Sequence, residues 1–111
     1  MTEERRRSKR TSLSAELDLK RVDGRDGKEV SASVVDISKT GLGFTSINTL
    51  RIGELYEFFL SIWTKEVIHA FLQVVRVELK GDGFFYGAAF IGMSETDSAR
   101  IEAYQAIHDT E

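Results

Sequence analysis

Residues 67–79, VIHAFLQVVRVEL, form the longest strand-like segment of the chain. Small or apolar side chains recur at every second position: Ile68, Ala70, Leu72 and Val74. This period of two is typical of a strand with one buried face, and Arg76 continues the same face. The turn Gly81-Asp82-Gly83 follows, and residues 84–91 are again rich in apolar side chains, so the two segments predict a β-hairpin.

Four further strand-like segments precede this hairpin and are separated by short turns and loops. They span residues 12–22, 28–37, 41–46 and 55–63. Six strands joined in this way predict an antiparallel barrel that is closed or nearly closed, because closure removes exposed strand edges. We therefore expect a mainly β protein built around a six-stranded antiparallel β-barrel.

The pattern changes from strand to helix at Ser94. Ser94-Glu95-Thr96-Asp97 is similar to a capping box and places acidic residues at the positive end of a helix dipole. Beyond it, Ile101, Tyr104 and His108 fall on one helical face. These features predict a C-terminal α-helix, residues 94–108, that packs against the barrel.

The first residues form a basic arm on an acidic body. Residues 1–11 show no hydrophobic periodicity, so we expect a flexible arm there and a single domain over residues 12–111. Residues 1–10 hold five basic and two acidic side chains, a charge of +3; since the whole chain carries −3, residues 11–111 carry −6. An acidic body repels an extended polyanion, so the asymmetry favours a compact anionic ligand for the arm.

Composition and spacing disfavour several classes of protein. The chain has no cysteine, which excludes disulfides, zinc fingers and thiol chemistry. No apolar stretch is long enough for a membrane span, and residues 1–10 do not resemble a signal peptide, so we expect a cytoplasmic protein. His69 and His108 belong to no cluster of metal ligands. Because no nucleophile stands at motif spacing from a base, we expect neither a metal cofactor nor catalysis.

A polar turn, Asp36-Ile37-Ser38-Lys39-Thr40-Gly41, lies between the second and third predicted strands. Alternation places Asp36 and Ser38 on one face of the strand end, and Gly41 lets the backbone turn sharply after them. A carboxylate accepts hydrogen bonds and a hydroxyl accepts or donates them, so the pair can bind the edge of a planar ligand such as guanine. The same residues also suit an ordinary hairpin turn that binds no ligand.

Two arginines of the basic arm, Arg6 and Arg10, are separated by three residues. Each guanidinium presents a planar fork of donors that suits phosphate oxygens, and each can also lie flat over a purine ring. Lysine supplies the charge without the fork. The alternative is a solvated basic tail with nonspecific affinity for polyanions.

Together these motifs resemble the PilZ domain family. The Arg-x-x-x-Arg arm before the first strand is Arg6 and Arg10, and the Asp-x-Ser-x-x-Gly motif at the end of the second strand is Asp36, Ser38 and Gly41. The segment 87–90, Gly-Ala-Ala-Phe, followed by a capped helix, is also similar to the end of that family's domain. The likeness covers nearly the whole chain.

The resemblance implies a bacterial receptor for the second messenger cyclic di-GMP (c-di-GMP). By analogy, Arg6 and Arg10 would contact phosphates and stack on guanine, and the aspartate, serine and glycine of the second motif would hold a guanine edge. Further candidates for contact with the ligand are Arg5, Arg7 and Arg76. An additional guanidinium at Arg5 would suit a second, intercalated ligand molecule.

The mechanistic hypothesis is that the arm is disordered without ligand and folds over it, which creates a surface for an unidentified protein partner. The receptor would be a monomer or a ligand-dependent dimer. Two alternatives stay open at this point. One is a nucleic-acid-binding barrel that uses the basic arm, which the acidic body disfavours; the other is a ligand-independent adaptor in which both motifs are structural.

Overall fold

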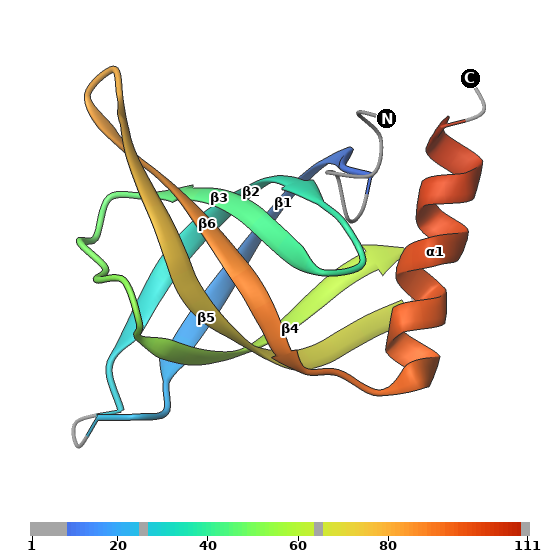
Figure 1. Cartoon of the computed structure of the whole chain (residues 1–111), viewed down its shortest axis with the longest axis horizontal. Coiled ribbons are helices and arrows are strands. Elements are labelled where there is room, and N and C mark those ends of the chain that lie inside the picture. Colours follow the sequence, from blue (N-terminus) through green and yellow to red (C-terminus); the bar gives the residue numbers. More distant parts are fainter. Residues whose placement is uncertain (1–8, 25–26, 64–65, 110–111) are drawn as a thin grey trace, which may run out of the picture.

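The computed structural model describes residues 9–24, 27–63 and 66–109 (Figure 1). Its elements follow one another as β1 (Thr11–Arg21), β2 (Glu29–Ile37), β3 (Gly41–Ser46), β4 (Leu55–Trp63), β5 (Glu66–Lys80), β6 (Gly83–Gly92) and α1 (Glu95–Asp109). All neighbouring strands are antiparallel, and they close a barrel in the order β1-β2-β3-β6-β5-β4. The predicted six-stranded barrel with a C-terminal helix is confirmed. Most of the predicted flexible arm, residues 1–8, lies outside the described residues.

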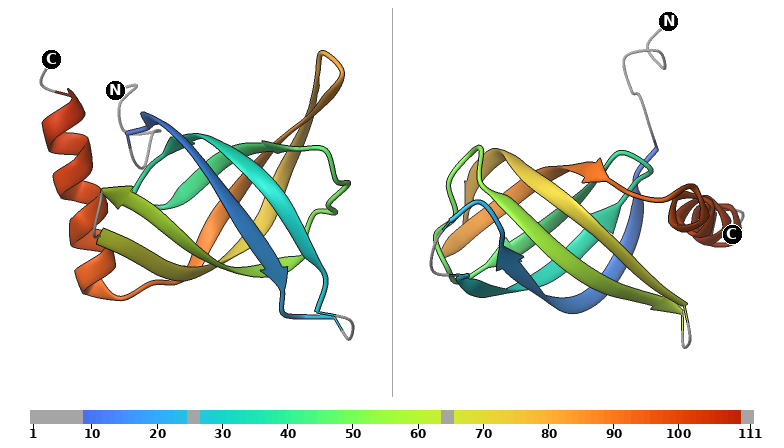
Figure 2. Two further views of the ribbon diagram at one scale, coloured as in Figure 1. Left: turned by 180° about the vertical axis from the view of Figure 1, so that it is seen from behind. Right: turned by 90° about the horizontal axis from the view of Figure 1, so that it is seen from below.

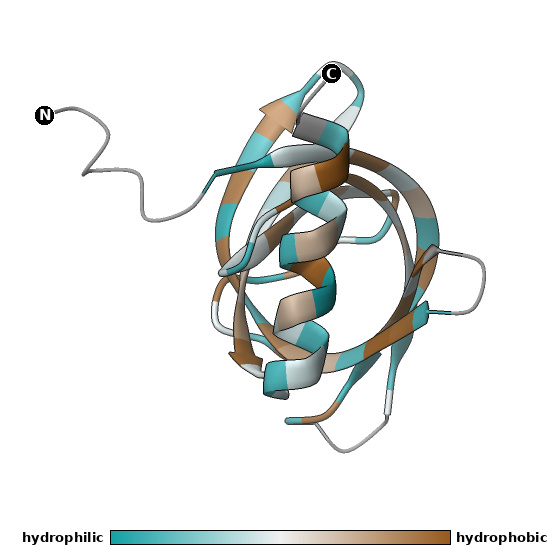
Figure 3. Ribbon diagram, turned by 90° about the vertical axis from the view of Figure 1, so that its right-hand side faces the viewer, coloured by the Kyte–Doolittle hydropathy of each residue, from teal (hydrophilic) through white to brown (hydrophobic). Residues whose placement is uncertain are grey.

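The core fills the inside of the barrel, and α1 lies across one end of it (Figures 2 and 3). Every strand contributes buried side chains. The largest fully buried ones are Tyr56, Tyr86, Phe44, Phe58, Leu19, Ile37, Leu42, Leu60, Ile68, Leu72, Ile101 and Val74. Because Ile101 of the helix belongs to this set, α1 is part of the domain's single core. Within the described residues, no helix combines the length and apolar character needed to cross a membrane.

Ser94 caps α1 as the sequence predicts, since its Oγ accepts a hydrogen bond from the Asp97 amide at 3.1 Å. The buried face of the helix differs from the predicted one. Ile101 and Tyr104 are buried, but Gln105 completes the face and His108 is exposed. A buried glutamine therefore stands where apolar periodicity alone does not predict one.

A β-bulge in β5 gives Arg76 an orientation that differs from the predicted one. Val74 pairs with Ala88, but the next pair is Arg76 with Gly87, so Val75 is an extra residue. One extra residue turns every following side chain to the opposite face of a strand. The uninterrupted alternation that placed Arg76 on the same face as Val74 is wrong, and Arg76 lies on the outer surface.

A second bulge lies in β2. Val34 pairs with Phe44 and Asp36 with Gly43, which leaves Val35 as the extra residue. Val34 and Ile37 point into the core, whereas Asp36 is on the outer side. The two bulges thus place Asp36 and Arg76 on the same outer surface of the β2-β3-β6-β5 sheet.

Candidate ligand-binding site

The root of the basic arm meets the polar turn on the surface of the barrel. Arg10 donates a hydrogen bond from Nη1 to Oδ1 of Asp36 at 2.7 Å, across 26 positions of sequence. The pairing of Ser12 with Asp36 between β1 and β2 brings the two together. The side chains of Arg10 and Asp36 keep 41% and 24% of their surface exposed, so a ligand can reach both. Arg5, Arg6 and Arg7 lie outside the described residues.

Ser38 shapes the turn between β2 and β3. Its Oγ accepts hydrogen bonds from the amides of Thr40 at 3.2 Å and Gly41 at 3.1 Å. Its own amide donates to the Gly41 carbonyl at 2.9 Å. Since Ser38 is only 1% exposed, these local bonds occupy its hydroxyl within the turn.

Gly41 is required for a close approach between β3 and β6. A Cβ at this position would lie 2.3 Å from the carbonyl oxygen of Ala88, which is a backbone atom that cannot move aside. Gly41 does not have a positive φ, so the turn needs no left-handed conformation at this residue. What this position requires is the absence of a side chain.

Two further glycines lie between Asp36 and Arg76. Asp36 pairs with Gly43, Gly43 with Gly87, and Gly87 with Arg76, which forms one row across β2, β3, β6 and β5. A Cβ on Gly43 would lie 2.6 Å from Oδ1 of Asp36. We call Asp36, Gly43, Gly87 and Arg76 the glycine row. Both glycines are buried: the Asp36 carboxylate and the Phe85 ring lie over Gly43, and the Arg76 guanidinium lies against Gly87.

The guanidinium end of the glycine row rests on an aromatic ring. Cζ of Arg76 lies 5.6 Å from the centre of the Phe85 ring, and Nζ of Lys80 lies 4.9 Å from the same centre. Glu78 pairs with Nε of Arg76 at 3.1 Å. Because Phe85 is only 8% exposed beneath two cations, Arg76 is held from below while half of its side chain stays accessible.

The sequence alone did not single out Gly43, Phe85 or Lys80, and it singled out Gly87 only as part of the Gly-Ala-Ala-Phe segment. Each is an ordinary strand or turn residue in its local context. Their grouping depends on the register of four strands, which no local pattern reveals.

A comparison with protein families shows that the PilZ domain matches residues 4–106. The chain belongs to the PilZ family. No curated protein matches its sequence.

Solved PilZ structures have the same fold. The PilZ domain of YcgR from Escherichia coli, solved with c-di-GMP, is 15% identical, with a TM-score of 0.74 over 96% of this chain and 92% of that one. MotI/DgrA, the inhibitor of motility of Bacillus subtilis, is 15% identical, with a TM-score of 0.77 over 95% of this chain and 51% of that one. The MrkH–c-di-GMP complex of K. pneumonia is 20% identical, with a TM-score of 0.73 over 95% and 53%. This chain therefore spans about half the length of MotI and MrkH.

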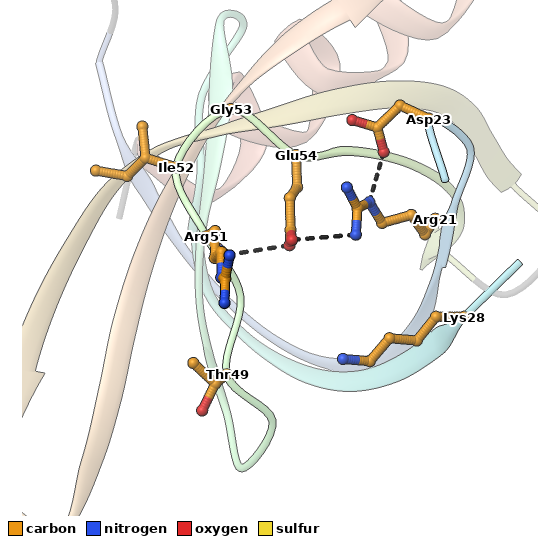
Figure 4. A pocket seen from close by; sticks show the side chains of 8 residues that line it. All are labelled: Arg21, Asp23, Lys28, Thr49, Arg51, Ile52, Gly53 and Glu54. Carbon is orange, nitrogen blue, oxygen red and sulfur yellow. Dashed lines mark hydrogen bonds and ion pairs between the residues drawn. The ribbon is translucent and has the colours of Figure 1, made fainter. Parts of the chain in front are cut away.

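The PilZ barrel has a second charged hollow at the other end of β1, with a volume of about 670 Å³ (Figure 4). Arg21 contacts Asp23 at 2.5 Å and Glu54 at 3.1 Å. Glu54 also accepts hydrogen bonds from the Arg51 amide at 3.0 Å and the Tyr56 hydroxyl at 2.8 Å. We call Arg21, Asp23, Glu54 and Tyr56 the closing cluster, because its groups satisfy one another and tie the loop before β4 to β1.

The pKa shifts of the closing cluster reflect this mutual pairing. The Arg21 hydrogen bond lowers the pKa of Asp23 below its ordinary value. Burial raises the pKa of Tyr56, and the Glu54 carboxylate that accepts its hydroxyl proton raises it further. Groups that are already paired in this way offer little to a ligand.

The two histidines of this PilZ domain contact carboxylate or aromatic side chains. His69 contacts Glu57 at 2.6 Å and stacks on Phe59 with ring centres 4.4 Å apart. His108 packs against the Tyr104 ring at 4.1 Å. Among residues 9–24, 27–63 and 66–109, no three histidine, aspartate or glutamate side chains are grouped to hold a metal ion.

Proposed function

We propose that this PilZ domain is a non-enzymatic receptor for c-di-GMP. The observation that carries the proposal is the contact between Arg10 and Asp36, which joins the Arg-x-x-x-Arg arm to the Asp-x-Ser-x-x-Gly turn at an exposed site. Family membership supports it, and so do the similar PilZ structures of YcgR and MrkH, which were solved with c-di-GMP.

The chemistry of the site suits the two kinds of group in c-di-GMP. Arg10 exchanges its Asp36 partner for a phosphate, and Arg6, four positions earlier in the arm, also contacts the phosphates. Asp36 is then free to accept hydrogen bonds from the N–H groups at the guanine edge. Each charge-assisted bond contributes about 1.5 to 3 kcal/mol, so exchanging one ion pair for two such contacts favours the complex.

The outer surface along the glycine row is where a flat base would lie. Asp36 and the Phe85 ring cover Gly43, and Arg76 covers Gly87, so the base would lie on these side chains and not on bare backbone. Arg76, supported by Phe85, places its planar guanidinium where it can stack on the base. Ser38 and Gly41 act here by setting the shape of the turn and the distance between β3 and β6.

The arm then passes the signal on. The arm ahead of Lys9 folds over the ligand and forms a surface that a protein partner recognises in the cytoplasm. Arg5 and Arg7 add cationic contacts, and a second stacked ligand molecule would turn the monomer into a ligand-dependent dimer.

Isothermal titration calorimetry of c-di-GMP into the wild type and the Arg10→Ala variant tests the proposal. We expect the wild type to bind and Arg10→Ala to lose about tenfold or more in affinity. Arg51→Ala is the matched control, because it removes an exposed arginine at the other end of the barrel. A wild type that gives no heat at several temperatures, and no competition with a fluorescent c-di-GMP analogue, would refute the receptor function.

A further inference from the structure

Helix α1 contacts both halves of the candidate site through one side chain. Nε2 of Gln105 donates a hydrogen bond to the Lys9 carbonyl at 2.6 Å and another to the Ile37 carbonyl at 3.3 Å. Lys9 directly precedes Arg10, and Ile37 lies between Asp36 and Ser38. A single amide group therefore joins the root of the arm to the polar turn.

Gln105 is well suited to fix this geometry. It is 9% exposed, and a side-chain amide has two N–H donors, one for each carbonyl. The packing of α1 around Ile101 and Tyr104 holds the glutamine in place. The Tyr104 hydroxyl also donates a hydrogen bond to the Ser12 carbonyl at 2.9 Å, and Ser12 is not one of the motif residues.

Another contact between helix and turn is weaker. Nζ of Lys39 lies 2.8 Å from Glu102, but their side chains are 46% and 56% exposed. Ion pairs with this degree of exposure contribute little because solvent screens them. Gln105 is thus the buried link between α1 and the two motifs.

We propose that Gln105 is a positioning residue that holds Arg10 against Asp36 before the ligand arrives. The proposal rests on the c-di-GMP site argued above and adds the helix to it. With the Lys9 carbonyl fixed, the Arg10 side chain starts from a defined point beside the turn. Without it, the arm root must be ordered when the ligand binds, and this ordering weakens affinity.

The first test needs no ligand. Gln105→Met keeps the volume and removes both donors, and Gln105→Glu keeps the shape but cannot donate a hydrogen bond from a carboxylate. We expect the ¹⁵N heteronuclear NOE of the Lys9 and Arg10 amides to fall in both variants. Arg100→Gln is the matched control, because Arg100 anchors α1 to the Val67 carbonyl and Glu66, away from both motifs. Unchanged NOE values in the Gln105 variants, or an equal fall in Arg100→Gln, would overturn the positioning role.

The second test is a double-mutant cycle on c-di-GMP affinity. Gln105→Met should weaken binding about three- to tenfold in the wild-type background. In the Arg10→Ala background the same substitution should have no further effect, because Gln105 acts through Arg10. Additive losses would show a general structural role instead. A wild type that fails to bind c-di-GMP refutes the receptor function, while the NOE values still decide whether Gln105 positions the arm.

Discussion

The two charged groups at opposite ends of β1 differ in what they leave available. The closing cluster joins four side chains, and each charge in it has a partner within the cluster. The Arg10–Asp36 pair is a single contact between the arm and a strand, with both side chains partly exposed. The same kind of arginine–carboxylate contact is therefore part of a paired network at one end of the strand and a partly exposed pair at the other.

The closing cluster and the Arg10–Asp36 pair differ in the backbone segments that they fix. The closing cluster fixes a loop that seals the barrel, and Leu55 also donates its amide to Asp23 at 3.3 Å. Asp36 sits over Gly43 with its side chain 24% exposed, so its carboxylate can turn to another partner without loss of a strand pairing. Substitutions in the two groups should thus separate stability from binding.

Asp36→Ala should show the largest effect, and on binding only. If Asp36 holds the guanine edge, affinity for c-di-GMP falls about tenfold to hundredfold by calorimetry. The free energy of unfolding should stay within about 0.5 kcal/mol of the wild type, because the lost ion pair is exposed. If Asp36 only competes with phosphate for Arg10, the variant would bind more tightly, and that outcome would contradict its proposed role.

Glu54→Ala should show the opposite behaviour. It removes the acceptor for Arg21, Arg51 and Tyr56, so the free energy of unfolding in urea should fall by about 1 to 2 kcal/mol. Affinity measured on the folded protein at low temperature should match the wild type. Glu102→Ala, which removes an exposed carboxylate from α1, is the control for stability. Weaker ligand binding in Glu54→Ala would show that the two ends of the barrel are not independent.

The barrel was predictable because its signals are local. Alternation and glycine-containing turns define six strands, and the predicted segment 55–63 coincides with β4. The bulge at Val75 was not predictable, since apolar residues on both sides of it suit either register. This single residue decides that Arg76 lies on the same outer surface as Asp36.

The site was predictable only in part. The motif residues Arg10 and Asp36 are in contact, as a shared site requires. Gly43 and Gly87 become neighbours in one row only through the pairing of β3 with β6, and Gln105 becomes a link only when the helix docks. Such groupings depend on tertiary contacts between segments far apart in the sequence.

Arg76→Lys tests whether the site extends to the far end of the glycine row. Lysine keeps the charge but has no planar group to stack on a base, so we expect affinity to fall about threefold. Stability should change little, because Arg76 is half exposed. Lys80→Arg is the control: it keeps a cation over Phe85 and should preserve the wild-type affinity. A variant Arg76→Lys that binds like the wild type would confine the site to the Arg10 and Asp36 end.

Lowering the pH should destabilise the fold through the closing cluster. The change in the free energy of unfolding should be smaller than the effects of the substitutions above. Burial opposes ionisation of Glu54, but the Arg51 amide, the Tyr56 hydroxyl and Arg21 together lower its pKa below the ordinary 4.5, and Asp23 is lowered from 3.8. A carboxyl whose pKa is lower in the folded chain stabilises the fold above its unfolded pKa, and this contribution is lost as pH falls through the folded value. The free energy of unfolding should therefore decrease below about pH 4.5, less steeply in Glu54→Gln than in the wild type. Urea titrations at several pH values, with circular dichroism to confirm the native fold, measure both slopes. Equal slopes would mean that Glu54 takes no part in the acid response. The closing cluster would then be no better paired than the Arg10–Asp36 contact at the other end of β1.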